Sequence, residues 1–96
     1  AHMGLTTGGA IGAETSTTLD DCVDRVTSIA KAGRAVRNDV IVLCHGGPIS
    51  MPADAQYMLD RCNIHGFYGA SSMERLPAET AITRQVRDFT NLRRAN

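Results

Sequence analysis

Apolar residues fall into three blocks along the chain, and the second and third each combine a short apolar run, a glycine-bearing loop and a helix-spaced stripe. The middle block is the clearest. Its apolar run VIVLC, residues 40–44, is rich in β-branched residues and apolar on both faces, which is typical of a parallel strand covered on both sides. HGGPISMPAD ends the run, and Pro52 suits the first turn of a helix. The following apolar residues recur at helical spacing: Ala55, Met58, Leu59 and Cys62.

The third block repeats this order. Residues 64–68 predict a short strand, which Gly66 weakens, and the loop GASSMERLP follows. Pro77 is expected to open a helix that runs to about Leu92. Its buried stripe should contain Ile82, Val86 and Phe89, which are spaced by four and three residues.

The first block has a loop and a helix but almost no strand. The loop reads GLTTGGAIGAET, and Thr18 can cap the helix that follows, with Asp20 and Asp21 in its first turn. The expected buried stripe of this helix is Leu19, Val23, Val26, Ile29 and Ala30. Only residues 1–3 precede the loop, so the first strand is expected to be truncated. They read either as a cloning remnant or as the end of a real strand, and we favour the strand.

Alternation of strand and helix predicts an α/β fold with parallel strands and right-handed crossovers. Three βα units cannot close a (β/α)8 barrel, which needs about 250 residues. The chain, residues 1–96, is therefore expected to be one domain that is either a small open sheet or part of a larger fold. Exposed strand edges would favour a homo-oligomer.

Charge and cysteine content exclude several classes of protein. Ten basic residues balance ten acidic ones, so the chain lacks the basic surface of a nucleic-acid binder. No apolar run is long enough to span a membrane, and no membrane partner is expected. The three cysteines, Cys22, Cys44 and Cys62, include no close pair, which argues against a disulfide framework or a zinc module. A reducing, cytoplasmic location fits best.

Three long motifs, GLTTGGAIGAET, VIVLCHGGPI and GFYGASSMERLP, resemble the C-terminal end of the phosphoenolpyruvate hydrolase-like TIM-barrel family, also called TIM-barrel signal transduction proteins. The resemblance covers about residues 4–92. It implies that the chain is the last three βα units of a TIM barrel. In that family the domain occurs alone in bacteria and at the C-terminus of longer plant and fungal proteins, including virus-resistance proteins.

The active site of a TIM barrel lies at the C-terminal ends of its strands, and phosphate is often bound by the last two βα loops. Here these loops are HGGPIS and GASSMERLP, in which bare glycine amides and serine hydroxyls can approach an anion. We expect them to form the two walls of a phosphate or carboxylate site, with Gly46 and Gly47 on one wall and Gly69, Ser71 and Ser72 on the other. The alternative is that Gly-Gly-Pro forms only a tight turn.

His45 ends the middle strand and is the first candidate catalytic residue. Because side chains alternate along a strand, Cys44 and His45 face opposite ways. We expect His45 to point into the barrel as a general acid or base and Cys44 to pack beneath the helices, where a thiol stays protonated. The alternative is that His45 only bonds nearby backbone.

Glu74 is the second catalytic candidate, and Arg75 beside it could clamp an anion. Each could equally serve in a salt bridge or at the start of the helix. Gly8 and Gly9 belong to a loop that matches neither GxxxxGK[ST] nor GxGxxG, and we expect it to have modest anion affinity. Glu14 in the same loop is more simply a solvated residue. The spacing of the histidines defines no metal site, and a divalent cofactor such as Mg²⁺ in the parent domain stays open.

Two functions follow from these expectations. In the first, the parent domain binds or hydrolyses a small phosphorylated or carboxylated acid, with His45 as acid or base, Glu74 assisting and the glycine loops holding the anion. The isolated chain would then be inactive, because most of the barrel wall is missing. In the second, the domain is a non-catalytic scaffold or regulatory module of a larger protein. Hydrolysis is implied only by the family resemblance. The residues themselves do not distinguish the enzyme from the non-catalytic module.

Overall fold

The computed structural model describes residues 1–9, 12 and 16–95, so that Glu14 lies outside the described residues. The elements follow in the order α1 (Leu19–Val36), β1 (Leu43–Cys44), α2 (Pro52–Arg61), β2 (Gly66–Phe67) and α3 (Arg75–Thr90). β1 and β2 are parallel, with Leu43 opposite Gly66 and Cys44 opposite Phe67. Strands and helices alternate, which confirms the prediction of a parallel α/β arrangement.

Residues 1–3 run beside β1 on the edge opposite to β2. His2 forms a parallel bridge with His45, and the Met3 N–H donates to the His45 carbonyl oxygen at 2.8 Å. The amino group of Ala1 donates to the carbonyl oxygen of Leu43 at 2.6 Å. Residues 1–3 therefore lie along the edge of β1 with the hydrogen bonds of a parallel pairing.

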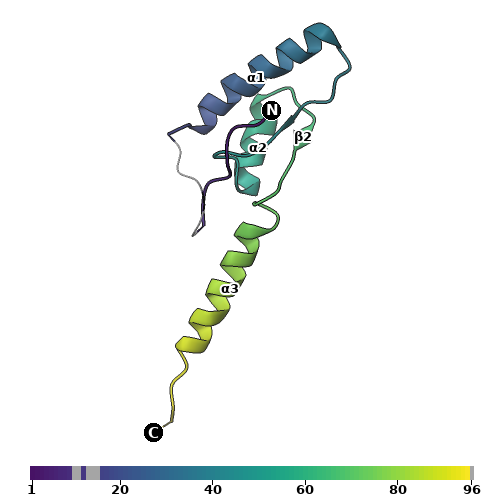
Figure 1. Cartoon of the computed structure of the whole chain (residues 1–96). Coiled ribbons are helices and arrows are strands. Elements are labelled where there is room, and N and C mark those ends of the chain that lie inside the picture. The colour runs from purple at the N-terminus through teal and green to yellow at the C-terminus, as the bar shows by residue number, and fades with distance from the viewer. Residues whose placement is uncertain (10–11, 13–15, 96) are drawn as a thin grey trace.

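The core lies where α1 and α2 pack against one face of the strands (Figure 1). Cys44 faces this core and is fully buried, as expected, and burial raises the pKa of its thiol. The fully buried side chains are Cys22, Val26, Cys44, Ile49 and Met58. Ile29 was expected in the buried stripe of α1 but is 47% exposed, because it lines an open hollow between α1 and the N-terminal residues His2 and Met3.

The predicted helix starts are confirmed for the first two helices. The Thr18 hydroxyl accepts from the Asp21 N–H at 3.1 Å, and the Asp21 carboxylate accepts from the Thr18 N–H at 3.0 Å, which is a complete capping box. Pro52 occupies the first turn of α2. Asp54 adds a cap, since its carboxylate accepts from the Met51 N–H at 2.9 Å.

Both strands are shorter than predicted, and the last helix begins earlier. Only Leu43 and Cys44 form the middle strand, and Ile41, expected to be covered, is 71% exposed. Ile41 is exposed because α1 and α2 cover one face of the strands and leave the other face, on which Ile41 lies, open. The last helix begins at Arg75, so Pro77 lies within its first turn, and it ends at Thr90.

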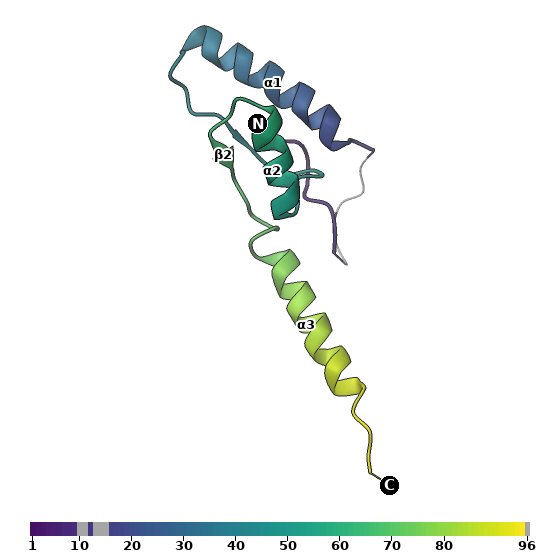
Figure 2. The same ribbon diagram turned by 180° about the vertical axis from the view of Figure 1, so that it is seen from behind.

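The predicted buried stripe of α3 is wrong for this structure. α3 projects away from the other elements in both views (Figures 1 and 2). Leu76, in its first turn, is its one buried residue among those described, and Phe89 is 63% exposed. The same holds for the rest of the stripe, Ile82 and Val86. Neither α3 nor the other helices in the described part of the chain are long and apolar enough to span a membrane.

Candidate functional site

Three rings meet at the C-terminal ends of the strands, on the face away from α1 and α2. The His45 ring lies between the other two, with its centroid 4.9 Å from that of His2 and 5.0 Å from that of Tyr68. Both contacts are edge-on, with interplanar angles of 64° and 68°. We call His2, His45 and Tyr68 the ring row. Because Cys44 faces the helices, its neighbour His45 faces the open side of the strands, as the alternation predicted.

The carbonyl of Tyr68 orients the His45 ring. Nδ1 of His45 lies 2.6 Å from the Tyr68 carbonyl oxygen, and Tyr68 is held in turn by its own N–H, which donates to the Cys44 carbonyl oxygen at 2.9 Å. A carbonyl oxygen can only accept, so the Nδ1 atom of His45 carries the proton. In the neutral ring the Nε2 atom therefore keeps its lone pair and can accept a proton or a hydrogen bond.

The glycine pair after His45 turns the chain back against the N-terminal segment. Gly46 and Gly47 have φ angles of 75° and 60°, in the left-handed region that favours glycine. A β-carbon on Gly46 would collide with the carbonyl oxygen of Gly4, and one on Gly47 with that of Met3. The Gly47 N–H donates to the Gly4 carbonyl oxygen at 2.8 Å, so in this structure it is not a free donor for an anion.

Arg75 connects the start of α3 to the first loop. Its Nη1 donates to the carbonyl oxygen of Gly8 at 2.8 Å, and its Nη2 to that of Thr6 at 3.4 Å. Nη1 also lies 3.3 Å from the Glu79 carboxylate, and both side chains are largely buried. The structure thus shows Arg75 in the salt bridge that was the alternative to an anion clamp, and its role toward an anion stays a prediction.

Replacing Arg75 with methionine should loosen the first loop without unfolding the chain. The variant loses two hydrogen bonds to loop carbonyls and one ion pair, and the expected loss of stability is about 1 kcal/mol. Hydrogen exchange at the amide of Thr7 should accelerate, because its bond to the Gly47 carbonyl oxygen loses the support of Arg75. Arg84→Met, at an exposed position of α3, is the control. Equal exchange rates in the two variants would refute this role for Arg75.

The other predicted site residues lie in the turn before α3. Gly69, Ser71 and Ser72 are half-buried there, and the carbonyl oxygen of Ser71 accepts from the Leu76 N–H at 2.8 Å. Glu74 is exposed at the N-cap position, where its side chain makes no capping hydrogen bond. His45, the glycine pair and the first loop are therefore in contact with one another. Within the described residues, Glu74 and the serines form no hydrogen bond with the ring row, and they are candidates only because they lie in the last loop.

The described residues do not bring together the ligands that a divalent metal ion needs. Mg²⁺ needs carboxylate or other oxygen ligands around an octahedron. Glu74 is the one carboxylate among the candidate site residues, and no group of three metal-ligating side chains forms in the described ranges. We therefore derive no step through a metal.

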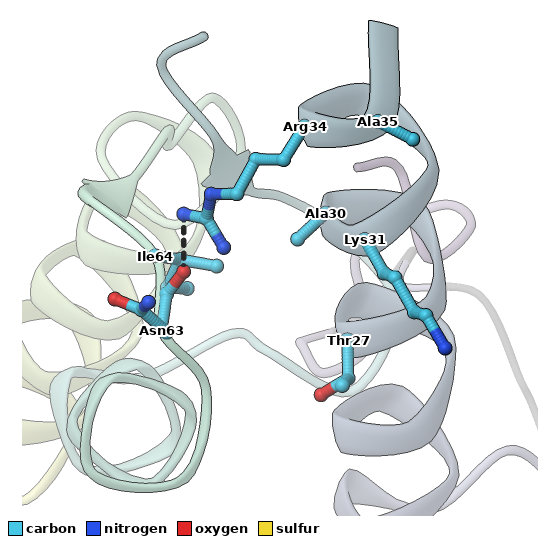
Figure 3. Close-up of a pocket in the computed structure, with 7 residues that line it drawn as sticks. All are labelled: Thr27, Ala30, Lys31, Arg34, Ala35, Asn63 and Ile64. Carbon is cyan, nitrogen blue, oxygen red and sulfur yellow. Dashed lines mark hydrogen bonds between the residues drawn. The ribbon is translucent and has the colours of Figure 1, made fainter. Parts of the chain in front are cut away.

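A separate hollow lies at the other end of the strands. A cavity of about 420 Å³ opens between the second half of α1 and the segment before β2 (Figure 3), lined by Thr27, Ala30, Lys31, Arg34, Ala35, Asn63 and Ile64. Arg34 Nη2 donates to the Asn63 carbonyl oxygen at 2.5 Å, and the Lys31 side chain points away from both (Figure 3). The cavity lies at the N-terminal ends of the strands, where its polar groups do not converge, and we do not assign it a ligand.

Sequence reasoning missed Tyr68 and left His2 in doubt. The signal for both was available, since each lies at the C-terminal end of a strand next to His45 in a parallel sheet. His65, by contrast, lies at the start of the strands and bonds to the backbone: its Nδ1 accepts from the Val42 N–H at 3.0 Å.

The fold is that of an α/β protein with parallel strands. Its candidate site lies at the C-terminal ends of these strands, which is where ligands bind in α/β folds. The sequence model of the phosphoenolpyruvate hydrolase-like family matches residues 1–92, and the chain belongs to that family. Two tomato (Solanum lycopersicum) proteins are 56% identical to it over 93 residues: the ToMV susceptible protein tm-1(GCR26) and the ToMV resistance protein Tm-1(GCR237). These residues are 96% of this chain but only 12% of each tomato protein.

Proposed function

We propose that the chain forms the last three βα units of a TIM barrel and carries one side of a site for a small phosphorylated or carboxylated acid. The observation that carries this proposal is the state of His45, whose Nδ1 is fixed on the Tyr68 carbonyl and whose Nε2 is left with a lone pair at the strand ends. A histidine held through one nitrogen by a backbone carbonyl is suited to proton transfer through the other.

The uncovered apolar surfaces support the barrel part of the proposal. One is the stripe of α3, with Ile82, Val86 and Phe89, and the other is the open face of the strands, with Ile41 and Leu43. A domain of this size does not normally leave such side chains in water. In a barrel, the preceding units would cover both surfaces, and in their absence self-association of the chain would do so.

In the parent domain, His45 would take or give the proton in the reaction and Glu74 would assist. The left-handed turn at Gly46 and Gly47 holds the backbone close to His45, and the amide of Gly47 is satisfied by Gly4. The anion would then be bound by the remaining amides and hydroxyls of the two strand-end loops, among them those of Ser71 and Ser72.

The test uses the longer domain that includes the preceding barrel units, titrated with phosphoenolpyruvate and with inorganic phosphate by calorimetry. We expect measurable affinity for both, and His45→Asn should weaken it at least about tenfold, since it keeps a donor for the Tyr68 carbonyl but has no Nε2 to accept the proton of a singly protonated phosphate group. Lys31→Met, at the other end of the strands, removes a cation and should leave affinity unchanged. Equal effects of the two substitutions, or no affinity in the unmodified domain, would contradict the proposal.

One observation favours a second function, a non-catalytic regulatory or scaffold module. The Gly47 amide and the Arg75 guanidinium, both predicted to face an anion, already bond to carbonyls of the first loop. The names of the tomato relatives concern susceptibility and resistance to a virus and state no reaction. Glu74→Gln separates the two functions, because only an enzyme should lose turnover while keeping its affinity.

A further inference from the structure

His2 takes the opposite tautomer to that of His45. The backbone N–H of Gly4 points at Nδ1 of His2 with a distance of 3.1 Å. An N–H group can only donate, so the Nδ1 of His2 carries a lone pair and its Nε2 carries the proton. His45 shows the reverse, because its Nδ1 faces the Tyr68 carbonyl oxygen. Each tautomer is therefore imposed by backbone rather than by a flexible side chain.

The two rings are positioned to act on one ligand. His2 and His45 are partners in a parallel bridge, so their side chains leave the strands on the same face, and their centroids are 4.9 Å apart. The Nε2 of His2 lies 3.6 Å from the place that a β-carbon on Gly46 would take, which puts it above the turn that follows His45. The pair thus presents one N–H donor and one nitrogen acceptor on the same face, on rings whose centroids are 4.9 Å apart.

A shared metal ion does not fit this pair. A histidine that binds a metal through Nε2 normally donates its Nδ1–H to a carbonyl or carboxylate. His45 meets this requirement, but His2 accepts at Nδ1 and keeps the proton on Nε2, where the metal would have to bind. The arrangement fits a ligand with both a hydrogen-bond acceptor and a hydrogen-bond donor.

We propose that His2 is a second ligand-binding residue of the site and that the pair recognises a small 2-hydroxy acid. The hydroxyl group donates to Nε2 of His45, and an oxygen of the adjacent carboxylate accepts from the Nε2–H of His2. No proton leaves His2, which acts as a neutral hydrogen-bond donor. This inference rests on the proposed acid site and adds to it a residue and a substrate class. The family match begins at residue 1 and so includes His2.

The first test reads the two tautomers directly. Long-range proton–nitrogen NMR of the chain with ¹⁵N-labelled histidine, recorded where the rings are neutral, distinguishes a protonated Nδ1 from a protonated Nε2. We expect a protonated Nδ1 for His45 and a protonated Nε2 for His2. The same tautomer in both rings would overturn the proposal, whether or not the site binds anions.

The second test compares lactate with propanoate, which lacks only the hydroxyl group, by calorimetry on the longer domain. Lactate should bind about tenfold more tightly, because propanoate leaves the His45 Nε2 without a partner. His2→Phe keeps a ring beside His45 but removes the donor, and should weaken lactate binding about tenfold. His2→Gln offers an amide N–H near the position of Nε2 and should retain most of the affinity.

The outcomes separate this inference from the proposed function. If phosphate and both acids bind, but lactate shows no advantage over propanoate, the acid site stands and the assignment of His2 fails. If neither acid nor phosphate binds, the proposed function itself fails, and the assignment of His2 fails with it. Equal affinity of His2→Phe and His2→Gln for lactate would also exclude His2 as the donor.

Discussion

Replacing Gly46 with alanine should destabilise the chain by roughly 2–5 kcal/mol, combining left-handed backbone strain with overpacking. The φ angle of Gly46 is 75°, and the added β-carbon would meet the carbonyl oxygen of Gly4, which is backbone and cannot swing away. The strand segment of residues 1–3 and the bond from the Gly47 N–H to Gly4 should be lost together. Such a loss is a large part of the 5–15 kcal/mol typical of a domain.

Urea unfolding followed by circular dichroism measures this change as a lower midpoint. Gly33→Ala is a matched control, because Gly33 lies inside α1 and an added β-carbon would meet only Val40, at 3.6 Å. That substitution should stabilise the chain by about 0.5–1 kcal/mol, the cost of glycine in a helix. If Gly46→Ala were as harmless as Gly33→Ala, the packing of the N-terminal segment on the glycine turn would be wrong.

Ile49→Ala should cost about 2–5 kcal/mol, because it empties space in the core. Ile49 follows the Gly-Gly-Pro turn and is fully buried with Cys44 and Met58. It therefore anchors the loop of the candidate site to the layer beneath the helices. The melting temperature should fall by about 4–8 °C for each kcal/mol lost, as measured by thermal unfolding.

Ile82→Ala is the control for Ile49→Ala. It removes the same atoms from the exposed stripe of α3, where Ile82 is 64% exposed, and in samples dilute enough to be monomeric it should change stability by no more than about 0.5 kcal/mol. A large effect of Ile82→Ala would show that α3 packs against another surface in solution. A small effect of Ile49→Ala would contradict the core described above.

Local signals predicted the elements and their order well. The capping box at Thr18 and the proline at the start of α2 depend on residues close together in sequence, and both formed as expected. The alternation along the middle strand correctly placed Cys44 toward the helices and His45 toward the open face. Such features need no knowledge of the rest of the fold.

Features that depend on distant partners were predicted less well. The spacing of Ile82, Val86 and Phe89 correctly indicated one face of a helix, but spacing cannot say what covers that face, and here it is exposed. The strands are short for a similar reason. A strand extends only as far as it is hydrogen-bonded to a neighbouring strand, and the run at residues 40–44 pairs with only two residues of β2.

The candidate site shows the same division. The sequence pointed to His45 and the glycine pair because they end a strand, and the structure adds His2 and Tyr68 because parallel strands end side by side. The bond from Arg75 to the Gly8 carbonyl spans most of the chain, and no pattern of neighbouring residues could indicate it. Glu74 and the serines were chosen for their loop, and Glu74→Gln tests the first of them.

The most direct test of the account is a crystal structure of the longer domain with phosphoenolpyruvate bound. We expect a phosphate oxygen of the ligand to lie within hydrogen-bond distance of Nε2 of His45, with the phosphate hydroxyl donating its proton to that nitrogen and Nδ1 still donating to the Tyr68 carbonyl oxygen. A ligand bound away from the ring row, or a His45 whose Nε2 instead donates to a carbonyl of the protein, would contradict it.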